Sequence, residues 1–143
     1  MAAVAKIQEL LGGEGVTGPL RSDLDVVRLV RRGVPTEAVD RFLELSQLSF
    51  SSIEAHVLPR RTFKRRQDAA QPLDPAESDR LLRLVRLVAS AEETFGDPRK
   101  ALAWLARENR VLDGQPPLSL ADTDLGARSV ETLLGQIAHG LAA

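Results

Sequence analysis

Residues 95–140 read FGDPRKALAWLARENRVLDGQPPLSLADTDLGARSVETLLGQIAHG, and this stretch decides the fold. Asp97 before Pro98 predicts a helix start, because an aspartate side chain can accept from a free backbone N–H and proline fits the first helical position. Apolar residues at helical spacing predict one helix after Pro98 and another that ends at Gly140. Between them, Gly114 and a Pro-Pro pair predict an irregular crossing of about ten residues. This helix, loop and helix have no feature of an active site.

The composition is that of a folded globular protein. Hydrophobic residues make up 43% of the 143 residues and charged residues 27%. Because the chain has no cysteine and only two histidines, we expect no disulfide, no metal site and no cofactor. No phosphate-binding glycine loop follows a strand and no serine has a positioned His and Asp, so we expect neither an enzyme nor a small-molecule substrate. No apolar run is long enough to cross a bilayer, which favours a cytoplasmic location without a membrane partner.

The chain divides into three parts, all expected to be helical. Valine and isoleucine fall at helical spacing, tyrosine is absent, and no hairpin dipeptide separates alternating runs, so we predict an all-α fold. We expect a loosely held helix and a flexible segment in residues 1–21, a first domain in residues 22–72 and a second domain in residues 73–143.

The two halves of the chain differ in charge. Residues 1–67 hold eleven Lys or Arg and eight Asp or Glu, a net charge of +3, whereas residues 68–143 hold eight and twelve, a net charge of −4. We therefore expect the halves to face different partners.

The first domain begins with a helix that Ser22 caps and that ends at Gly33. Its first turn is acidic and its last turn is basic, in agreement with the helix dipole. We expect its buried side to hold Leu24, Val27 and Val30, with Leu29 beside them.

A helix-turn-helix outline follows in residues 49–67. Ser51 and Glu54 are spaced as a capping box for a short helix, which Leu58-Pro59 ends. The RRTFKRR run then predicts a basic helix that lies in the DNA major groove. A charge run is also typical of a solvated basic face or of a surface that meets an acidic protein, so these alternatives stay open. The predicted DNA-binding residues are Arg60, Arg61, Thr62, Lys64, Arg65 and Arg66.

A long helix from about Ala76 to Glu93 opens the second domain. Asp74-Pro75 supplies the same start as Asp97-Pro98 and adds Glu77 at the third helical position. The apolar residues of this helix spread over more than one side, which indicates more than one covering surface. The alternative to a second copy is that residues 1–50 cover the helix within one chain. We favour the second copy and predict a homodimer through Leu81, Leu82, Val85, Leu87 and Val88.

One ordered series of residues runs through 95–140. Its members are Phe95-Gly96-Asp97, Ala101, Trp104-Leu105, Asn109, Leu112, Gly114, Pro117-Leu118-Ser119-Leu120, Thr123, Gly126-Ala127, Val130, Leu134, Ile137 and His139-Gly140. The series resembles the C-terminal toxin-binding domain of the Xre/MbcA/ParS antitoxins. Arg61-Thr62-Phe63 with Arg65-Arg66 is similar to the end of the Xre-like helix-turn-helix in the same family. Residues 1–21 match no pattern of the family.

The resemblance implies an antitoxin of a type II toxin–antitoxin system. The implied partners are a RES-domain toxin that consumes NAD, a second copy of the chain, and operator DNA through which the complex represses its own operon. It also implies that the C-terminal helix and tail cover the toxin's active-site cleft, and the short tail leaves open whether they cover or enter it. The expected toxin-binding residues are Gly126, Ala127, Arg128, Gln136, His139, Gly140 and Leu141.

Two other functions remain open from the sequence. The runner-up is a stand-alone helix-turn-helix transcriptional regulator whose C-terminal domain only dimerises. A third is a helical scaffold for some other protein. Read without the resemblance, His139 is a histidine at a helix end, where the dipole favours its charged form.

Overall fold

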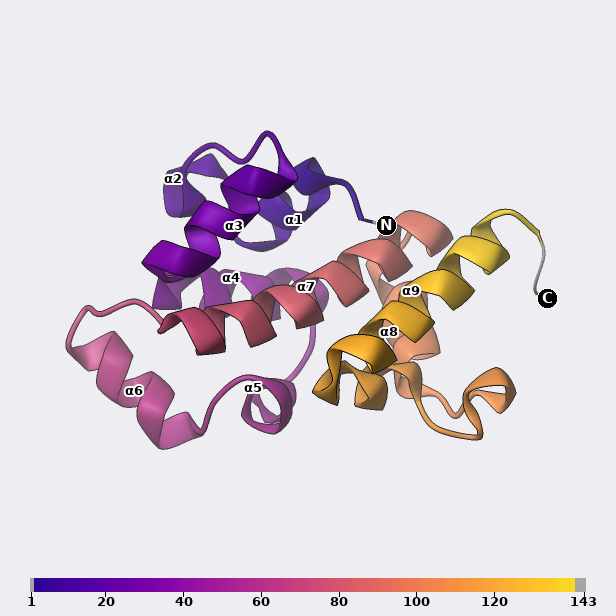
Figure 1. Ribbon diagram of the computed structural model, residues 1–143. Helices are drawn as coiled ribbons and strands as arrows, with labels where there is room; N and C mark the ends of the chain where they lie inside the picture. The colour runs from indigo at the N-terminus through magenta and orange to yellow at the C-terminus, as the bar shows by residue number, and fades with distance from the viewer. Residues whose placement is uncertain (1, 141–143) are drawn as a thin grey trace.

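The structure is a computed structural model and describes residues 2–140. Every regular element within these residues is a helix, which confirms the prediction of an all-α fold (Figure 1). The helices in chain order are α1 Val4–Leu10, α2 Glu14–Thr17, α3 Asp23–Arg32, α4 Thr36–Ser46, α5 Phe50–His56, α6 Arg60–Asp68, α7 Pro75–Phe95, α8 Pro98–Ala106, the 3-10 turns η1 Arg110–Leu112 and η2 Pro117–Asp122, and α9 Asp124–Ala138.

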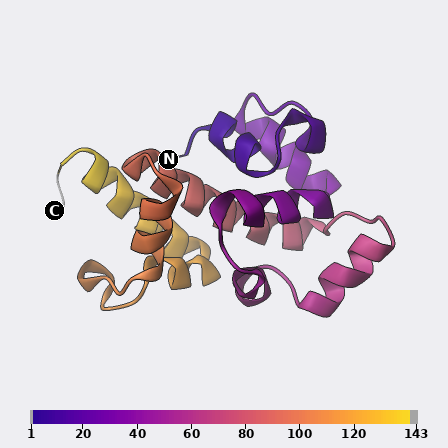
Figure 2. The ribbon, with the colours of Figure 1, turned by 180° about the vertical axis from the view of Figure 1, so that it is seen from behind.

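Helix α7 is the centre of the molecule. It packs against α1, α3, α4 and α5 from the first half of the chain and against α8, η2 and α9 from the second half. Figures 1 and 2 show α5 and α6 near its N-terminal end and α8 and α9 beside its C-terminal end. One continuous helix therefore connects the region of the predicted DNA contacts with the region of the predicted toxin contacts.

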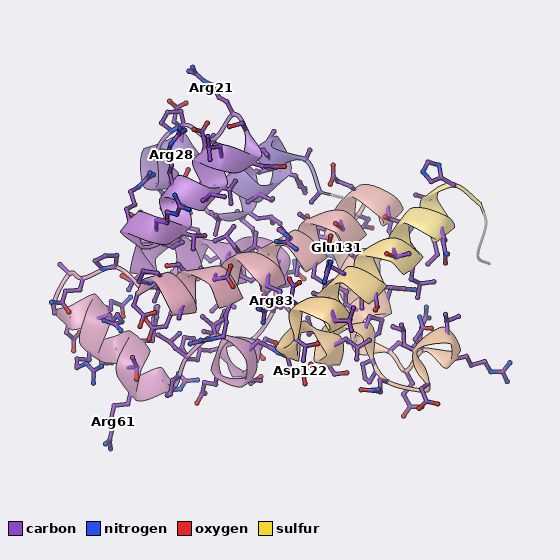
Figure 3. The ribbon with its side chains drawn as sticks, viewed as in Figure 1. Arg21, Arg28, Arg61, Arg83, Asp122 and Glu131 are labelled. Carbon is purple, nitrogen blue, oxygen red and sulfur yellow. The ribbon has the colours of Figure 1, made fainter. Side chains whose placement is uncertain are left out.

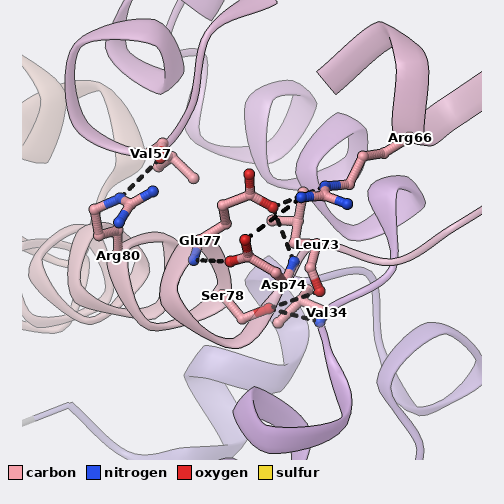
Figure 4. A network of polar contacts seen from close by, with 8 residues as sticks. All are labelled: Val34, Val57, Arg66, Leu73, Asp74, Glu77, Ser78 and Arg80. Atoms are coloured by element: carbon pink, nitrogen blue, oxygen red, sulfur yellow. Dashed lines mark hydrogen bonds and ion pairs between the residues drawn. The ribbon is translucent and has the colours of Figure 1, made fainter. Parts of the chain in front are cut away.

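The start of α7 confirms the expected capping residues. Glu77 N–H donates to Asp74 Oδ1 at 2.7 Å, and Asp74 N–H donates to Glu77 Oε1 at 2.8 Å (Figure 4). Pro75 occupies the first helical position. The same junction holds the loop after α3, because Val34 N–H donates to the buried Ser78 hydroxyl at 2.9 Å.

The apolar side chains of α7 are covered within a single chain, and this corrects the expected dimer surface. The five residues assigned to a second copy are each 3% exposed or less: Leu81, Leu82, Val85, Leu87 and Val88. Helices from both halves of the same chain fill the space around α7, which is the alternative that the sequence left open. These five residues cannot form a dimer surface, and a homodimer through another surface stays a prediction.

The N-terminal segment is packed more tightly than expected. Leu10 and Leu11 of this segment are almost completely buried, and α1 lies against α7. Lys6 Nζ lies 3.0 Å from Glu92 Oε1, and the Glu92 side chain is only 4% exposed. The side chain of Glu93 accepts from the Ala3 backbone N–H. Burial of an ion pair and two leucines fixes α1 onto the end of α7.

Helix α3 is rotated from the predicted orientation, because Val30 and Leu29 pack in the core but Leu24 and Val27 do not. Ser22 accepts from Asp25 N–H, as expected of its cap position. However, Leu24 is 52% exposed and Val27 is 38% exposed, whereas Leu29 is buried. Helix α3 therefore packs against α7 through the side that carries Leu29, and Leu24 and Val27 lie at the surface.

Candidate functional site

Helices α5 and α6 form the expected pair of a short helix and a basic helix, but α5 begins differently. The predicted capping box is wrong, because α5 starts at Phe50 with Ser49 as its N-cap residue. Ser51 pairs through its hydroxyl with Ser49, and Glu54 accepts from Arg60 Nε at 3.3 Å. Glu54 thus connects the two helices instead of capping the first.

Phe63 anchors α6 to the protein. Its ring is 6% exposed and lies 5.2 Å from the Phe50 ring, centroid to centroid. The Arg60 guanidinium lies 4.3 Å from the centre of the Phe50 ring on α5. A further link to α4 comes from Gln67 Nε2, which donates to Asp40 at 3.0 Å.

Two of the six predicted DNA-binding residues have structural contacts. Arg66 Nε donates to Glu77 Oε1 at 2.8 Å, and its Nη2 lies 3.4 Å from Asp74 Oδ2 (Figure 4). Its side chain is only 20% exposed. Arg66 therefore fixes α6 to the start of α7, and Arg60 fixes α6 to α5.

Arg61 and Arg65 are the residues of α6 that remain available for DNA. Both are exposed, and neither takes part in an ion pair within residues 2–140. Figure 3 shows Arg61 extending away from the body of the molecule. Lys64 is also exposed and pairs only with Asp68 one turn later, a contact that contributes little to stability. Thr62 is half-buried.

The start of α9 explains two of the residues that the sequence assigned to toxin binding. Thr123 caps the helix by accepting from Gly126 N–H at 2.9 Å. A Cβ atom added to Gly126 would collide with the Leu120 carbonyl oxygen and would lie 2.8 Å from Thr123 Oγ1. Ala127 is completely buried. Both residues permit close packing of α9 on η2, so their small side chains have a role in the fold, and contact of the half-buried Gly126 with a toxin stays a prediction.

The other predicted residues of α9 lie on its solvent side. Exposed residues recur along the helix at helical spacing and form what we term the α9 stripe: Leu125, Arg128, Ser129, Thr132, Gln136 and His139. The sequence analysis named Arg128, Gln136 and His139 but missed Leu125, which is 69% exposed. Counting back from Gln136 in steps of three and four residues would have identified it. Gly140 is exposed, and Leu141 lies outside the described residues.

A hollow lies on each side of α9. One, of about 390 Å³, has an apolar floor that includes the Phe95–Trp104 ring pair, and its rim carries Arg107, Glu108 and Arg110. The other, of about 200 Å³, is bordered by the carboxylates of Glu93 and Glu131 and by His139. The α9 stripe is therefore flanked by an apolar hollow with charges of both signs on its rim on one side and by an acidic hollow on the other.

Among residues 2–140 there is no cluster of three or more His, Cys, Asp or Glu side chains placed to hold a metal ion. No helix in the described part of the chain has the length and apolar character needed to span a membrane.

Two family models match the chain. The antitoxin Xre-like helix-turn-helix domain matches residues 25–86, which include most of α3, all of α4 to α6 and the first half of α7. The antitoxin Xre/MbcA/ParS C-terminal toxin-binding domain matches residues 90–140, which include the end of α7 and all of α9. The two matches meet inside α7, and the division predicted at residue 72 stays a prediction.

Three curated relatives are similar to the chain. The Antitoxin Xre of Pseudomonas putida is 40% identical over 84 residues, which are 59% of this chain and 53% of that protein. The Antitoxin Xre of Yersinia enterocolitica is 30% identical over 118 residues, 81% of this chain and 80% of that protein. The Prs ADP-ribosylating antitoxin of a Sphingobium species is 27% identical over 129 residues, 83% of this chain and 81% of that protein.

Proposed function

This chain belongs to the Xre family of antitoxins, and from that membership we propose that it silences a NAD-degrading toxin of the RES type by binding over the toxin's active-site cleft. In this proposal the α9 stripe is the contact surface. The tail beyond Gly140 covers or enters the cleft. The system is of type II, in which one protein inhibits another by direct binding.

The exposed side of α9 is the observation that carries this proposal. It lies in the region matched by the toxin-binding family model, and it has no other packing partner in the described chain. Leu125 on α9 and Val111 on η1 are the two most exposed large hydrophobic residues in this half. Exposed apolar side chains with polar neighbours are typical of protein-binding surfaces.

Co-expression with the toxin tests the proposal. We expect the unchanged antitoxin to restore growth and cellular NAD, and the double variant Leu125→Asp/Thr132→Arg to fail, because it places charges in the centre of the contact surface. Leu45→Asp is the matched control, since Leu45 is an exposed leucine on α4. Equal rescue by the unchanged protein and the α9 double variant would contradict this contact surface. These surface changes are preferable to deletion of residues 126–143, which would also remove the buried side of α9.

A second toxin class is suggested by the name of the Sphingobium relative, which refers to ADP-ribosylation of Prs. A toxin that ADP-ribosylates a protein also consumes NAD, but it leaves ADP-ribose attached to its target. Mass spectrometry of cellular proteins after toxin induction separates the two classes. Loss of NAD without protein-bound ADP-ribose supports the RES type, and protein-bound ADP-ribose supports the other.

We also propose that α6 binds the operator of the antitoxin's own operon, so that the toxin–antitoxin complex represses its own synthesis. Support comes from the helix-turn-helix match and from the exposed Arg61 and Arg65. In a mobility-shift titration at several salt concentrations, Arg61→Ala/Arg65→Ala should lower the slope of log K against log salt by about 2, since each phosphate contact contributes roughly 0.9. Arg21→Ala/Arg28→Ala is the control, because both arginines lie on the far side of the molecule from α6 (Figure 3). An unchanged slope in the α6 variant would contradict DNA contact by this helix.

The stand-alone regulator remains the second candidate function. It is favoured by the same pair of free arginines on α6. Under that function, the α6 double variant would abolish all measurable activity, and the α9 variant would behave like the unchanged protein in every assay. Neutralisation that survives the α6 changes supports the antitoxin function.

A further inference from the structure

The smaller hollow beside α9 lies between this helix and α7 and is bordered by two carboxylates. Glu93 of α7 and Glu131 of α9 both line it, and we term it the acidic hollow. Figure 3 shows Glu131 where α9 runs alongside α7. Among the residues within 2–140 that line the acidic hollow, none is a lysine or an arginine. Its border therefore offers negative charge and hydrogen-bond acceptors without a strong cation of its own.

Both carboxylates are held in place and keep capacity for further donors. The Glu131 side chain is only 10% exposed, and its Oε1 lies 3.4 Å from Arg86 Nη2. Glu93 Oε1 accepts from the Ala3 backbone N–H at 3.1 Å. Within the described part of the chain, each carboxylate has this one polar contact. Since an ionised carboxylate has about four acceptor positions, most of its capacity remains for a partner.

A buried hydroxyl that lines the acidic hollow has no partner. Ser90 is 6% exposed, and its Oγ makes no hydrogen bond with any described residue. The neighbouring Thr94 hydroxyl donates to the Ser90 carbonyl at 2.8 Å and leaves the Ser90 hydroxyl unpaired. Buried hydroxyls in folded proteins are nearly always paired, because an unpaired one is costly. The hydroxyl therefore points to a polar group that enters the hollow from outside.

Gly135 keeps the acidic hollow open. It lies inside α9, where glycine is less favourable than alanine. Apart from the backbone of its own helix, nothing lies within 4 Å of an added Cβ, so packing does not require a glycine here. A longer side chain at this position would occupy the hollow, which Gly135 lines. The free space of about 200 Å³ holds about six water molecules or one long side chain, and it is too small for a helix about 10–12 Å across.

We propose that the acidic hollow receives a basic side chain of the toxin, an arginine or a lysine, when the complex forms. This inference rests on the proposed function, because the hollow borders the α9 stripe and His139 belongs to both. A guanidinium group has five N–H donors and an ammonium group has three, so either can donate to both carboxylates and to the Ser90 hydroxyl. Hydrogen bonds between two charged groups are about twice as strong as neutral ones.

Calorimetric titration of the toxin with antitoxin variants at pH 8, where histidine is neutral, tests this inference. Glu93→Gln/Glu131→Gln removes both charges but keeps an oxygen acceptor for the Ala3 N–H and for Arg86. We expect it to weaken toxin binding at least tenfold. Glu37→Gln/Glu44→Gln on α4 is the matched control, because it also removes two exposed carboxylates, and it should stay within twofold of the unchanged protein.

Gly135→Leu tests the space in the hollow without a change of charge. The leucine side chain should fill the hollow and weaken toxin binding at least tenfold, and Gly135→Ala should have a smaller effect. Circular dichroism and urea unfolding verify that every variant keeps the fold, so that a loss of affinity reports on the hollow.

A double-mutant cycle identifies the basic side chain. Each arginine and lysine of the toxin is changed to methionine in turn, and one such change should weaken binding to the unchanged antitoxin but not to the double glutamine variant. If no basic residue of the toxin behaves in this way, the inference is wrong.

Failure of this inference can be told apart from failure of the proposed function. If the unchanged protein does not bind the toxin, both fail together. If it binds, and the double glutamine variant and Gly135→Leu bind equally well, the hollow holds only water in the complex and this inference alone fails.

Discussion

Helices α6 and α9 each present one side to solvent, but different types of residue attach the two helices to the rest of the protein. α6 is attached by one aromatic ring and by two of its own arginines, Arg60 and Arg66. α9 is attached by a broad apolar side and by the tight packing of Gly126 and Ala127 on η2. Some charged residues that suggest binding are therefore structural in α6, and some small residues that suggest binding are structural in α9. A residue type alone does not separate the two roles.

Among the variants that test this comparison of α6 with α9, we expect the largest effect on stability at Gly126. Gly126→Ala forces α9 away from the Leu120 carbonyl, and we expect it to lower the free energy of unfolding by about 2–3 kcal/mol, the usual cost of overpacking. Gly135→Ala on the same helix is the control, because no atom lies within 4 Å of the added carbon. It should raise stability by up to about 1 kcal/mol. Urea unfolding measures both, and equal stabilities of the Gly126 variant and the unchanged protein would return Gly126 to the list of partner contacts.

The next effect is expected at Arg66. Arg66→Ala leaves the buried Glu77 carboxylate without its cation, and we expect a loss of about 1–2 kcal/mol in unfolding free energy. Its neighbour Arg65 is exposed, so Arg65→Ala should change stability by less than about 0.5 kcal/mol. DNA affinity should respond in the opposite way, with the larger loss in the Arg65 variant. If Arg66→Ala lowers DNA affinity more than Arg65→Ala while leaving stability intact, Arg66 is a DNA contact and the comparison fails for α6.

A crossed experiment uses the two surface ion pairs. Lys64–Asp68 on α6 and Arg128–Asp124 on α9 are both exposed pairs one helical turn apart. Removing either cation should change stability by less than about 0.5 kcal/mol. We expect Lys64→Ala to weaken operator binding and spare toxin binding, and Arg128→Ala to do the reverse. Both affinities can be measured by isothermal titration calorimetry, and a single variant that weakens both would show that the two surfaces are not separate.

The smallest effect is expected at His56 on α5. This helix packs against η2 and so connects the region of α6 with the region of α9. Burial lowers the pKa of His56, and the Asp122 carboxylate only partly opposes this. Because the folded-state pKa lies below the unfolded value of about 6.5, protonation favours unfolding, and stability should fall as the pH drops from about 7.5 to about 5. The difference in proton uptake is at most one proton per chain. His56→Gln should reduce this dependence on pH in urea unfolding, and identical pH profiles would exclude a contribution from His56.

The sequence predicted most local features of the fold, with the capping box of Ser51 and Glu54 as the exception. The capping roles of Ser22, Asp74 and Asp97 depend on a few neighbouring residues, and the structure confirms all three. Burial was predicted less well, because it depends on which distant helix arrives on which side. Leu24 has the same hydrophobic spacing as a core residue, yet the core reaches α3 from the side of Leu29.

The candidate site shows the same limit. The sequence identified the basic helix α6 and the terminal helix α9. On each helix, some of the predicted binding residues are exposed and available to a partner, and others are held by contacts within the protein. The residues held within the protein, such as Arg66 and Gly126, could not be recognised from the sequence. Their contacts depend on how α7 and η2 pack in the folded chain. The difference between the prediction and the structure was greatest for α7. Its broad apolar surface suggested contact with a second copy of the chain, but helices of the same chain cover that surface.

The first twenty residues have a consequence for how small this antitoxin can be. They lie outside both family matches, yet Ile7, Leu10 and Leu11 are buried in the core, and α1 covers apolar surface of α4 and α7 that would otherwise meet water. A fragment trimmed to the matched residues would uncover that surface and leave the Glu92 carboxylate without its lysine. The folded unit that keeps this surface covered is thus larger than the two matched regions, and its extra part includes α1, which packs on α4 and α7.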